Sequence, residues 1–203
     1  MRTVSVSLVL GQTAGLADSY HMNSQPPSSD NERGASLVEF SLVLPILLLI
    51  VFGILEMGMA FRTTITVGSA AQEGARVASF KGNDTDADCV ALESVISELG
   101  GEVDQVSSIK LYRVDTAGNP EPLKTNTYTY SGVGDITDCT KWNGTVLWPS
   151  SDRNVTVGTT PLDVLGVEVS STHTWVTQFP PFGGSITVDE STIVRLEPEA
   201  YDT

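Results

Sequence analysis

The feature that most constrains this chain is a run of apolar residues near its N-terminus. Residues 42–55 read LVLPILLLIVFGIL and carry no polar side chain. Extended to residues 40–61, the run admits only Ser41 and Glu56 as polar residues. About 20 apolar residues, each rising ~1.5 Å, match the thickness of a bilayer core. The alternative is a core helix of a soluble protein, but the rest of the chain is too polar to surround one. We therefore expect a transmembrane helix over residues 35–61.

Several residues make this run unusual for a simple anchor. Pro45 removes one helix hydrogen bond and tends to kink the axis. Gly53 and Gly58 leave flat patches where another helix can approach closely. Two carboxylates bracket the run, and a charge at membrane depth is costly unless it has a partner or a function. We assign Glu39, Pro45, Gly53, Glu56 and Gly58 to helix packing or assembly, although Glu56 could instead lie at the far interface.

The residues before the run form a polar leader, which we place at residues 1–34. It contains Pro26-Pro27 together with serines, asparagines and charged residues. Residues 1–17 faintly resemble a secretory signal, because Arg2 precedes a short apolar stretch. An alternative is that translation starts at Met22.

The junction between leader and helix has a recognisable order of residue types. Gly34-Ala35-Ser36-Leu37-Val38-Glu39-Phe40 resembles the motif of prepilin-type signals. That resemblance implies cleavage between Gly34 and Ala35 by a membrane aspartic prepilin peptidase on the cytoplasmic face, with the apolar helix retained. Gly34 suits a protease cleft because it has no side chain to clash. The new amine of Ala35 could pair with the Glu39 carboxylate of a neighbouring subunit, which would offset the cost of burying that charge.

A longer stretch extends the resemblance. Residues 33–76 resemble the N-terminal segment of the TadE-like family, which are pseudopilins or minor pilins of the tight-adherence (Tad/Flp) pilus and secretion machinery. The matching features are RGxxxVEF from Arg33, the Leu44-Pro45 pair, FGxxE at residues 52–56 and AAxEGAR at residues 70–76. Residues 166–199 also look like the end of the family. Residues 83–160 carry no family motif, and Met59 stands where many relatives have an arginine.

The resemblance implies a single-pass protein of the cytoplasmic (inner) membrane, with its N-terminus inside and its C-terminal domain outside, or a subunit of a surface filament. It implies as partners the membrane, the prepilin peptidase, other pilin or pseudopilin subunits and Tad assembly proteins. The basic residues taken alone favour the opposite orientation, because Arg33 lies on one side and Arg62, Arg76 and Lys81 on the other. The rival function is an uncleaved, membrane-tethered adhesin or binding module without a pilus role.

Beyond the anchor we expect an α+β domain with an antiparallel sheet. The helical pattern continues to about residue 80, so residues 62–82 form a helix extension and linker. Within an acidic domain at residues 83–203, apolar residues from Cys89 to Leu99 recur at helical spacing up to Gly100-Gly101. Alternating patterns predict strands at residues 108–115, 124–130, 164–177 and 185–196, with a loop-rich region around Trp142 and Trp148.

Charge and cysteine content narrow the function classes. The formal net charge is −14, and from Arg62 onward there are 9 basic and 20 acidic residues, a net of −11. A surface this negative disfavours nucleic acid as a partner. Cys89 and Cys139 are the only cysteines. They are either two buried thiols or one bridge, which in the loop-entropy picture would contribute ~3–4 kcal/mol for a loop of roughly 50 residues.

No catalytic or metal-binding constellation is evident. Asp84, Asp86 and Asp88 alternate as in a calcium loop, but Cys89 and Val95 replace its glycine and its bidentate glutamate, so we interpret the aspartates as a solvated helix start. His21 and His173 are the only histidines, too few for a His-based metal site or a triad in the mature chain. We therefore predict a protein that is not an enzyme, with no metal and no cofactor.

Overall fold

The computed structural model describes residues 29–158, 160–178, 180 and 183–198, with side chains from residue 34 onward. The signal-like segment, the alternative start at Met22 and His21 lie outside the described residues. Contacts divide the chain into two compact units, residues 1–46 and 47–203, and each is described by itself.

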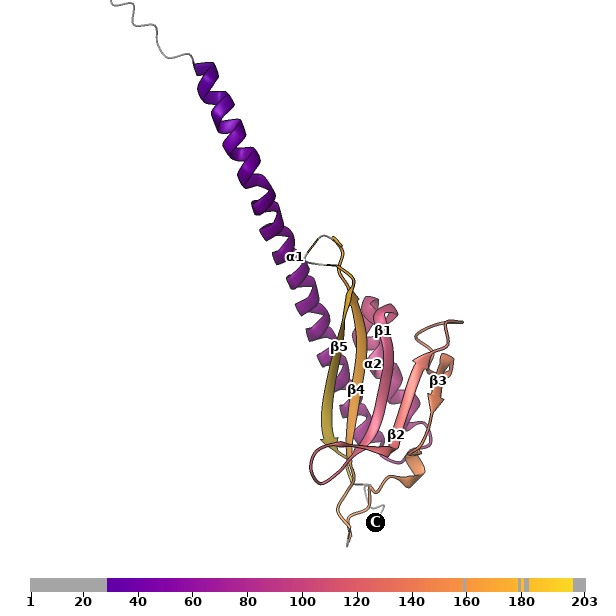
Figure 1. Ribbon diagram of the computed structural model, residues 1–203. Coiled ribbons are helices and arrows are strands. Elements are labelled where there is room, and N and C mark those ends of the chain that lie inside the picture. The colour runs from indigo at the N-terminus through magenta and orange to yellow at the C-terminus, as the bar shows by residue number, and fades with distance from the viewer. Residues whose placement is uncertain (1–28, 159, 179, 181–182, 199–203) are drawn as a thin grey trace, which may run out of the picture. The chain divides into compact units, whose positions relative to one another are not determined.

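The described chain contains two long helices, five strands and three short 3₁₀ helices (Figure 1). Their bounds are α1 (Ser29–Lys81), α2 (Ala87–Leu99), η1 (Gly100–Gln105), β1 (Val106–Val114), β2 (Pro120–Tyr130), η2 (Cys139–Lys141), β3 (Trp142–Thr145), η3 (Ser150–Asp152), β4 (Val164–Thr174) and β5 (Ser185–Arg195). The predicted α+β class is confirmed.

Helix α1 runs through both units. In the first unit, its side chains from residue 34 to 46 are nearly all exposed, and Pro45 lies inside the helix. In the second unit, the helix acquires a buried side. Glu56, Ala60, Thr63, Val67 and Ala70 follow one another at intervals of four or three residues, and all are buried. This spacing places them on one face of the helix, which packs on the rest of the domain.

The five strands form one antiparallel sheet in the order β3-β2-β1-β4-β5. Two hairpins, β1–β2 and β4–β5, meet in the middle of the sheet through β1 and β4. There Ile109 lies opposite Val169 and Leu111 opposite Val167, and all four are fully buried. Apolar residues at every second position therefore supply a continuous buried face.

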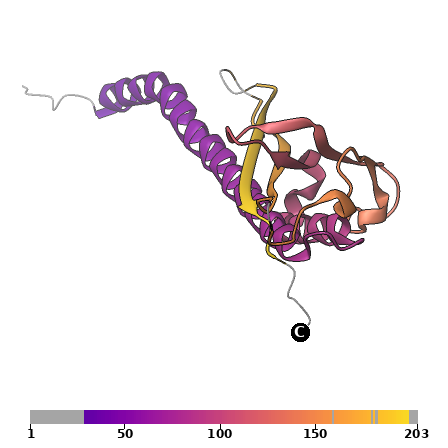
Figure 2. The same cartoon turned by 90° about the horizontal axis from the view of Figure 1, so that it is seen from below.

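Both helices cover that buried face. Helix α2 and the part of α1 in the second unit lie on the same side of the sheet, as Figures 1 and 2 show. Their close approach depends on Gly74 of α1. A Cβ atom there would lie 2.3 Å from Val95 Cγ2 of α2 and 3.5 Å from Val167 Cγ1 of β4. A side chain at position 74 would thus push the two helices apart.

The structure revises several details of the sequence interpretation. The region around Trp142 contains β3, a strand that was not predicted, and β2 begins at Pro120 rather than at residue 124. Asp86 precedes α2 at the N-cap position but makes no side-chain capping hydrogen bond. Trp142 and Trp148 are both buried in the core.

Candidate functional site

The proposed processing site lies at the start of the described side chains. Gly34 and Ala35 are within α1, and a Cβ atom at Gly34 would meet nothing within 4 Å. Glu39 is exposed, and no hydrogen bond or ion pair joins it to another described residue. The Glu39 carboxylate is therefore free to meet a group from outside the chain.

The apolar run over residues 42–55 is exposed at nearly every position. Among the described residues, one helix is long and apolar enough to cross a membrane, and none of its most hydrophobic 18-residue stretch is buried. Exposed large side chains such as Leu42 (70%) and Ile46 (64%) would be costly in water. These observations are consistent with a single-pass membrane anchor.

The two glycines of the apolar run lie at the same depression in the surface of α1. Gly53 and Gly58 both line an apolar depression of about 520 Å³ on α1, together with Leu49, Ile54 and Phe61. A Cβ atom at Gly58 would meet nothing within 4 Å. The packing role that we assign to these glycines stays a prediction.

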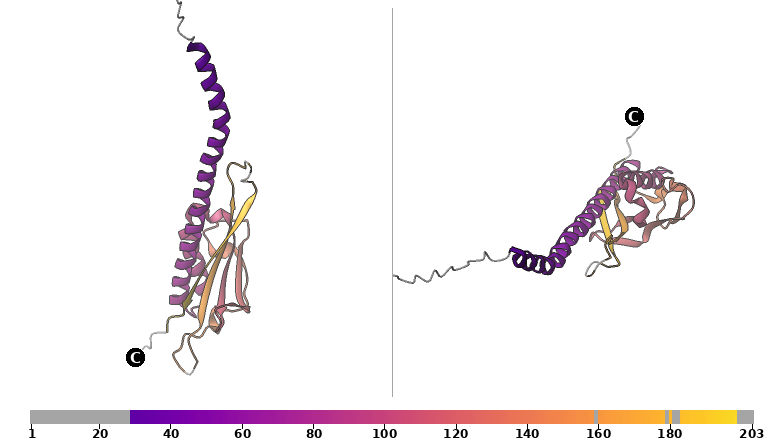
Figure 3. Two further views of the ribbon diagram at one scale, coloured as in Figure 1. Left: turned by 60° about the vertical axis from the view of Figure 1, so that its left-hand side comes forward. Right: turned by 90° about the horizontal axis from the view of Figure 1, so that it is seen from above.

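Glu56, the second carboxylate of the run, has its partners inside the chain. Its side chain is 0% exposed, and both of its oxygens accept backbone hydrogen bonds from the segment that follows β4. The N–H of Val176 donates to Oε2 at 3.1 Å, and the N–H of Thr177 donates to Oε1 at 2.5 Å. The carboxylate therefore ties α1 to the connection between β4 and β5, which run beside α1 in Figures 1 and 3.

The side-chain amide of Gln178 makes further hydrogen bonds within the connection between β4 and β5. Gln178 has a φ of 48°, which is uncommon for a residue other than glycine. Its Nε2 donates to the carbonyl of Trp175 at 2.5 Å, and its Oε1 accepts from the N–H of Gly184 at 3.0 Å. The backbone amides that face Glu56 are thus held in place from both sides.

His173, at the end of β4, is buried close to the Glu56 contact. Its Nδ1 lies 3.2 Å from the hydroxyl of Thr63, which follows Ala60 on the buried face of α1. Its ring meets that of Trp175 edge-on at 5.3 Å. Thr63 and Glu56 therefore connect the same face of α1 to the same end of β4.

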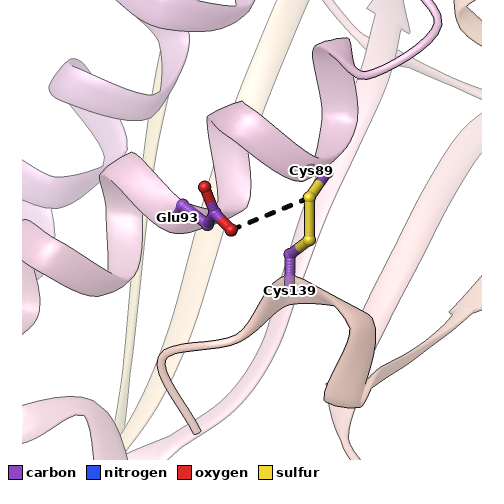
Figure 4. A group of neighbouring side chains, drawn as sticks. All are labelled: Cys89, Glu93 and Cys139. Carbon is purple, nitrogen blue, oxygen red and sulfur yellow. Dashed lines mark hydrogen bonds between the residues drawn. A yellow bond between two sulfur atoms is a disulfide. The ribbon is translucent and has the colours of Figure 1, made fainter.

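Cys89 of α2 and Cys139 of η2 are joined by a disulfide, with their Cα atoms 5.4 Å apart (Figure 4). Glu93 Oε1 lies 3.9 Å from Cys89 Sγ, and the three groups lie within 4.8 Å of one another. Because both sulfur atoms are used in the bridge, the cluster has no free thiolate to offer a metal. The bridge ties α2 to the segment that leads into β3.

The interpretation of the three aspartates as a solvated helix start is wrong for Asp88. Its carboxylate accepts hydrogen bonds from Arg153, from Asn126 at 2.8 Å and from the Tyr128 hydroxyl at 2.5 Å. Arg153 has a fully buried side chain and stacks on Trp148 at 4.9 Å. Burial, followed by the negative charge of Asp88, raises the pKa of the Tyr128 hydroxyl well above its ordinary value.

The other two aspartates behave as expected. Asp84 and Asp86 lie at the surface, each with a carboxylate oxygen 3.4 Å from the Lys81 ammonium at the end of α1. Because Asp88 points to Arg153 instead, the three carboxylates do not converge as a calcium loop requires.

Comparison with known protein families matches residues 34–76 to the family described as TadE-like protein. The matched residues begin at Gly34 and include Glu39, Glu56 and Gly74, so the resemblance seen in the sequence is confirmed over this segment. No curated protein and no solved structure matches the chain.

Proposed function

We propose that this chain is a TadE-like pseudopilin that takes part in assembling a Flp/Tad-type pilus or secretion apparatus. The observation that carries the proposal is the family match over residues 34–76, which contains the prepilin-type junction Gly34-Ala35 and Glu39. The exposed apolar helix supports it, because such a surface requires either lipid or neighbouring subunits. The proposal includes no catalytic role.

In this proposal the leader lies in the cytoplasm and the acidic domain outside the cytoplasmic membrane. A prepilin peptidase removes the leader after Gly34 and leaves Ala35 as the new N-terminus. The mature helix then packs against other pilin or pseudopilin subunits, within the membrane or in a filament, and the apolar depression around Gly53 and Gly58 is a surface for that contact.

The two carboxylates of the apolar run, Glu39 and Glu56, differ in their hydrogen-bond partners. Both carboxylate oxygens of Glu56 accept hydrogen bonds from the backbone N–H groups of Val176 and Thr177 in the same chain. Glu39 has no such partner among the described residues, and a lone carboxylate in lipid is costly. We therefore assign the pairing with the amine of Ala35 from a neighbouring subunit to Glu39, and an internal role to Glu56.

Two substitutions test the proposal in a cell that contains the peptidase. Gly34→Leu should leave the protein at full length, because the side chain blocks the protease cleft. Glu39→Ala should still insert and be cleaved, but should fail to co-purify with the other pilin subunits. A wild-type chain that stays at full length in this cell, together with normal assembly of Glu39→Ala, would instead favour the uncleaved, tethered binding module.

A further inference from the structure

A cavity of about 510 Å³ lies inside the second unit, between α1, η1 and the end of β4. Its lining includes Met59 and Arg62 from α1, Glu102 and Gln105 from η1, and His173 from β4. It is distinct from the Glu56 contact, although Val176 borders both.

Three polar atoms of the lining residues are buried without a hydrogen-bond partner in the described chain. They are Glu102 Oε2, Gln105 Oε1 and His173 Nε2. His173 is 5% exposed. Buried polar atoms are nearly always paired, and one that is left unpaired is costly. All three atoms belong to residues that line the cavity, and we take them as the acceptors that a polar ligand there would meet.

The lining defines the chemistry of that ligand. A carboxylate oxygen and an amide oxygen only accept hydrogen bonds. When His173 Nδ1 donates to the Thr63 hydroxyl, its Nε2 becomes a third acceptor. Three acceptors, one of them charged, fit a primary ammonium, which offers three N–H donors. A quaternary ammonium has no N–H and cannot satisfy them.

A second charge stands at the edge of the cavity. Arg62 Nε lies 3.4 Å from Glu102 Oε1, and the Arg62 side chain is 79% exposed while that of Glu102 is 13% exposed. The guanidinium has five donors, so most of them remain for an anion. Arginine binds phosphate well because its planar donors match the phosphate oxygens. The cavity and its edge thus pair an ammonium site with a phosphate site.

The place of these residues in the chain points to the source of such a ligand. Arg62 is the first basic residue after the apolar run, and Met59 lies within that run. If the run crosses a bilayer, this turn of α1 lies at the depth of the lipid headgroups. We propose that the cavity binds the headgroup of a phosphatidylethanolamine-type lipid. Its ammonium enters toward Glu102, Gln105 and His173, and its phosphate meets Arg62.

This inference rests on membrane anchoring alone and does not depend on cleavage or on entry into a filament. The test uses the full chain reconstituted in vesicles with equal amounts of phosphatidylethanolamine and phosphatidylcholine. The protein is then extracted in mild detergent, and the lipids that remain bound are counted by native mass spectrometry. Because only the first lipid can donate N–H groups to buried acceptors, we expect it to be retained about fivefold or more over the second.

Two variants and a matched control locate the effect. Glu102→Gln should bring the retention ratio close to one, whereas Glu98→Gln, an exposed residue of α2, should leave the ratio unchanged. Arg62→Gln changes an exposed side chain and so should preserve the fold while weakening retention of both phospholipids. It keeps the test decisive if Glu102→Gln unfolds.

Three results would overturn the inference. Equal retention of the two lipids by the wild-type chain is the first. The second is an unchanged preference in Glu102→Gln together with undiminished retention in Arg62→Gln. The third is occupation of the cavity by something else. This could be a stoichiometric divalent metal that is lost in Glu102→Gln, or soluble phosphoethanolamine retained in vesicles that contain only phosphatidylcholine.

Discussion

The carboxylate of Glu56 accepts the backbone N–H of Thr177 at 2.5 Å, although 121 residues separate the two in sequence. A glutamate that follows a long apolar run thereby connects α1 to the β4–β5 hairpin. Charged acceptors make the stronger class of hydrogen bond, and more so where water is excluded. The contact should therefore fix how the β4–β5 connection sits on α1.

Replacing Glu56 with glutamine tests this role. The side chain keeps its size, but one of its two acceptor oxygens becomes an NH₂ donor that faces an N–H. We expect the amide of Val176 or Thr177 that faces the new NH₂ group to exchange with deuterium roughly tenfold faster or more, because its acceptor is lost. Glu73→Gln on the same helix is the control, since Glu73 pairs with Arg76 at the surface. Equal exchange in both variants would show that the contact does not hold the connection.

Loss of the disulfide should lower the stability of the domain. Cys89 and Cys139 close a loop with a sequence separation of 50. Replacing both with serine should reduce the free energy of unfolding by about 3–4 kcal/mol, mainly because the unfolded chain is released from a constraint. Chemical denaturation of the full chain, oxidised and with both cysteines replaced, measures the difference. Two alkylatable thiols in the protein isolated from cells would contradict the bridge.

The ion pair of Asp88 and Arg153 should matter more than the surface pairs. Because the Arg153 side chain is 0% exposed, Asp88→Asn leaves its charge without a counter-ion. We expect a loss of about 3–5 kcal/mol in the free energy of unfolding, as for other broken buried pairs. Arg76→Met breaks an exposed pair and should cost below about 1 kcal/mol.

A double variant separates the ion pair from general packing. Asp88→Asn combined with Arg153→Met removes both charges and keeps much of the volume, so its loss should be smaller than the sum of the two single losses. Strictly additive losses would mean that the two side chains stabilise the domain independently of each other.

The turn between β1 and β2 should respond to acid. Backbone N–H groups, chiefly that of Asn119 and then that of Ala117, donate to the Asp115 carboxylate and lower its pKa below the ordinary value of 3.8. A lowered pKa means that the stabilisation is present above pH 3.8 and is lost as the pH falls through the folded value. Carboxyl carbon shifts followed by NMR should therefore give a midpoint below 3.8. A midpoint at or above 3.8 would contradict the bonding.

Much of the fold could be predicted from periodicity. The helical spacing from Cys89 to Leu99 and the alternation in β1, β4 and β5 each reflect one buried face, and the structure contains all four elements. Strand β3 was missed because it is short and its residues, Trp142-Asn143-Gly144-Thr145, include two that are rare in strands. It forms because it pairs with β2 along one edge of the sheet.

The internal partners of charged residues were harder to predict. The donors to Glu56 could not be predicted because they are backbone N–H groups, which leave no signature in a sequence. Arg153, which donates to Asp88, lies 65 residues from it. One signal for Glu56 was present. Stepping back along α1 from Val67 by four, three and four residues gives Thr63, Ala60 and Glu56, which is the face that packs on the domain.

Processing as a prepilin-type protein can be tested by determining the N-terminus of the protein isolated from native membranes. Intact mass and N-terminal sequencing give it without any substitution. We predict a chain that begins at Ala35 and retains the whole apolar helix. A chain that still carries the residues before Gly34, in a cell with an active prepilin peptidase, would contradict it.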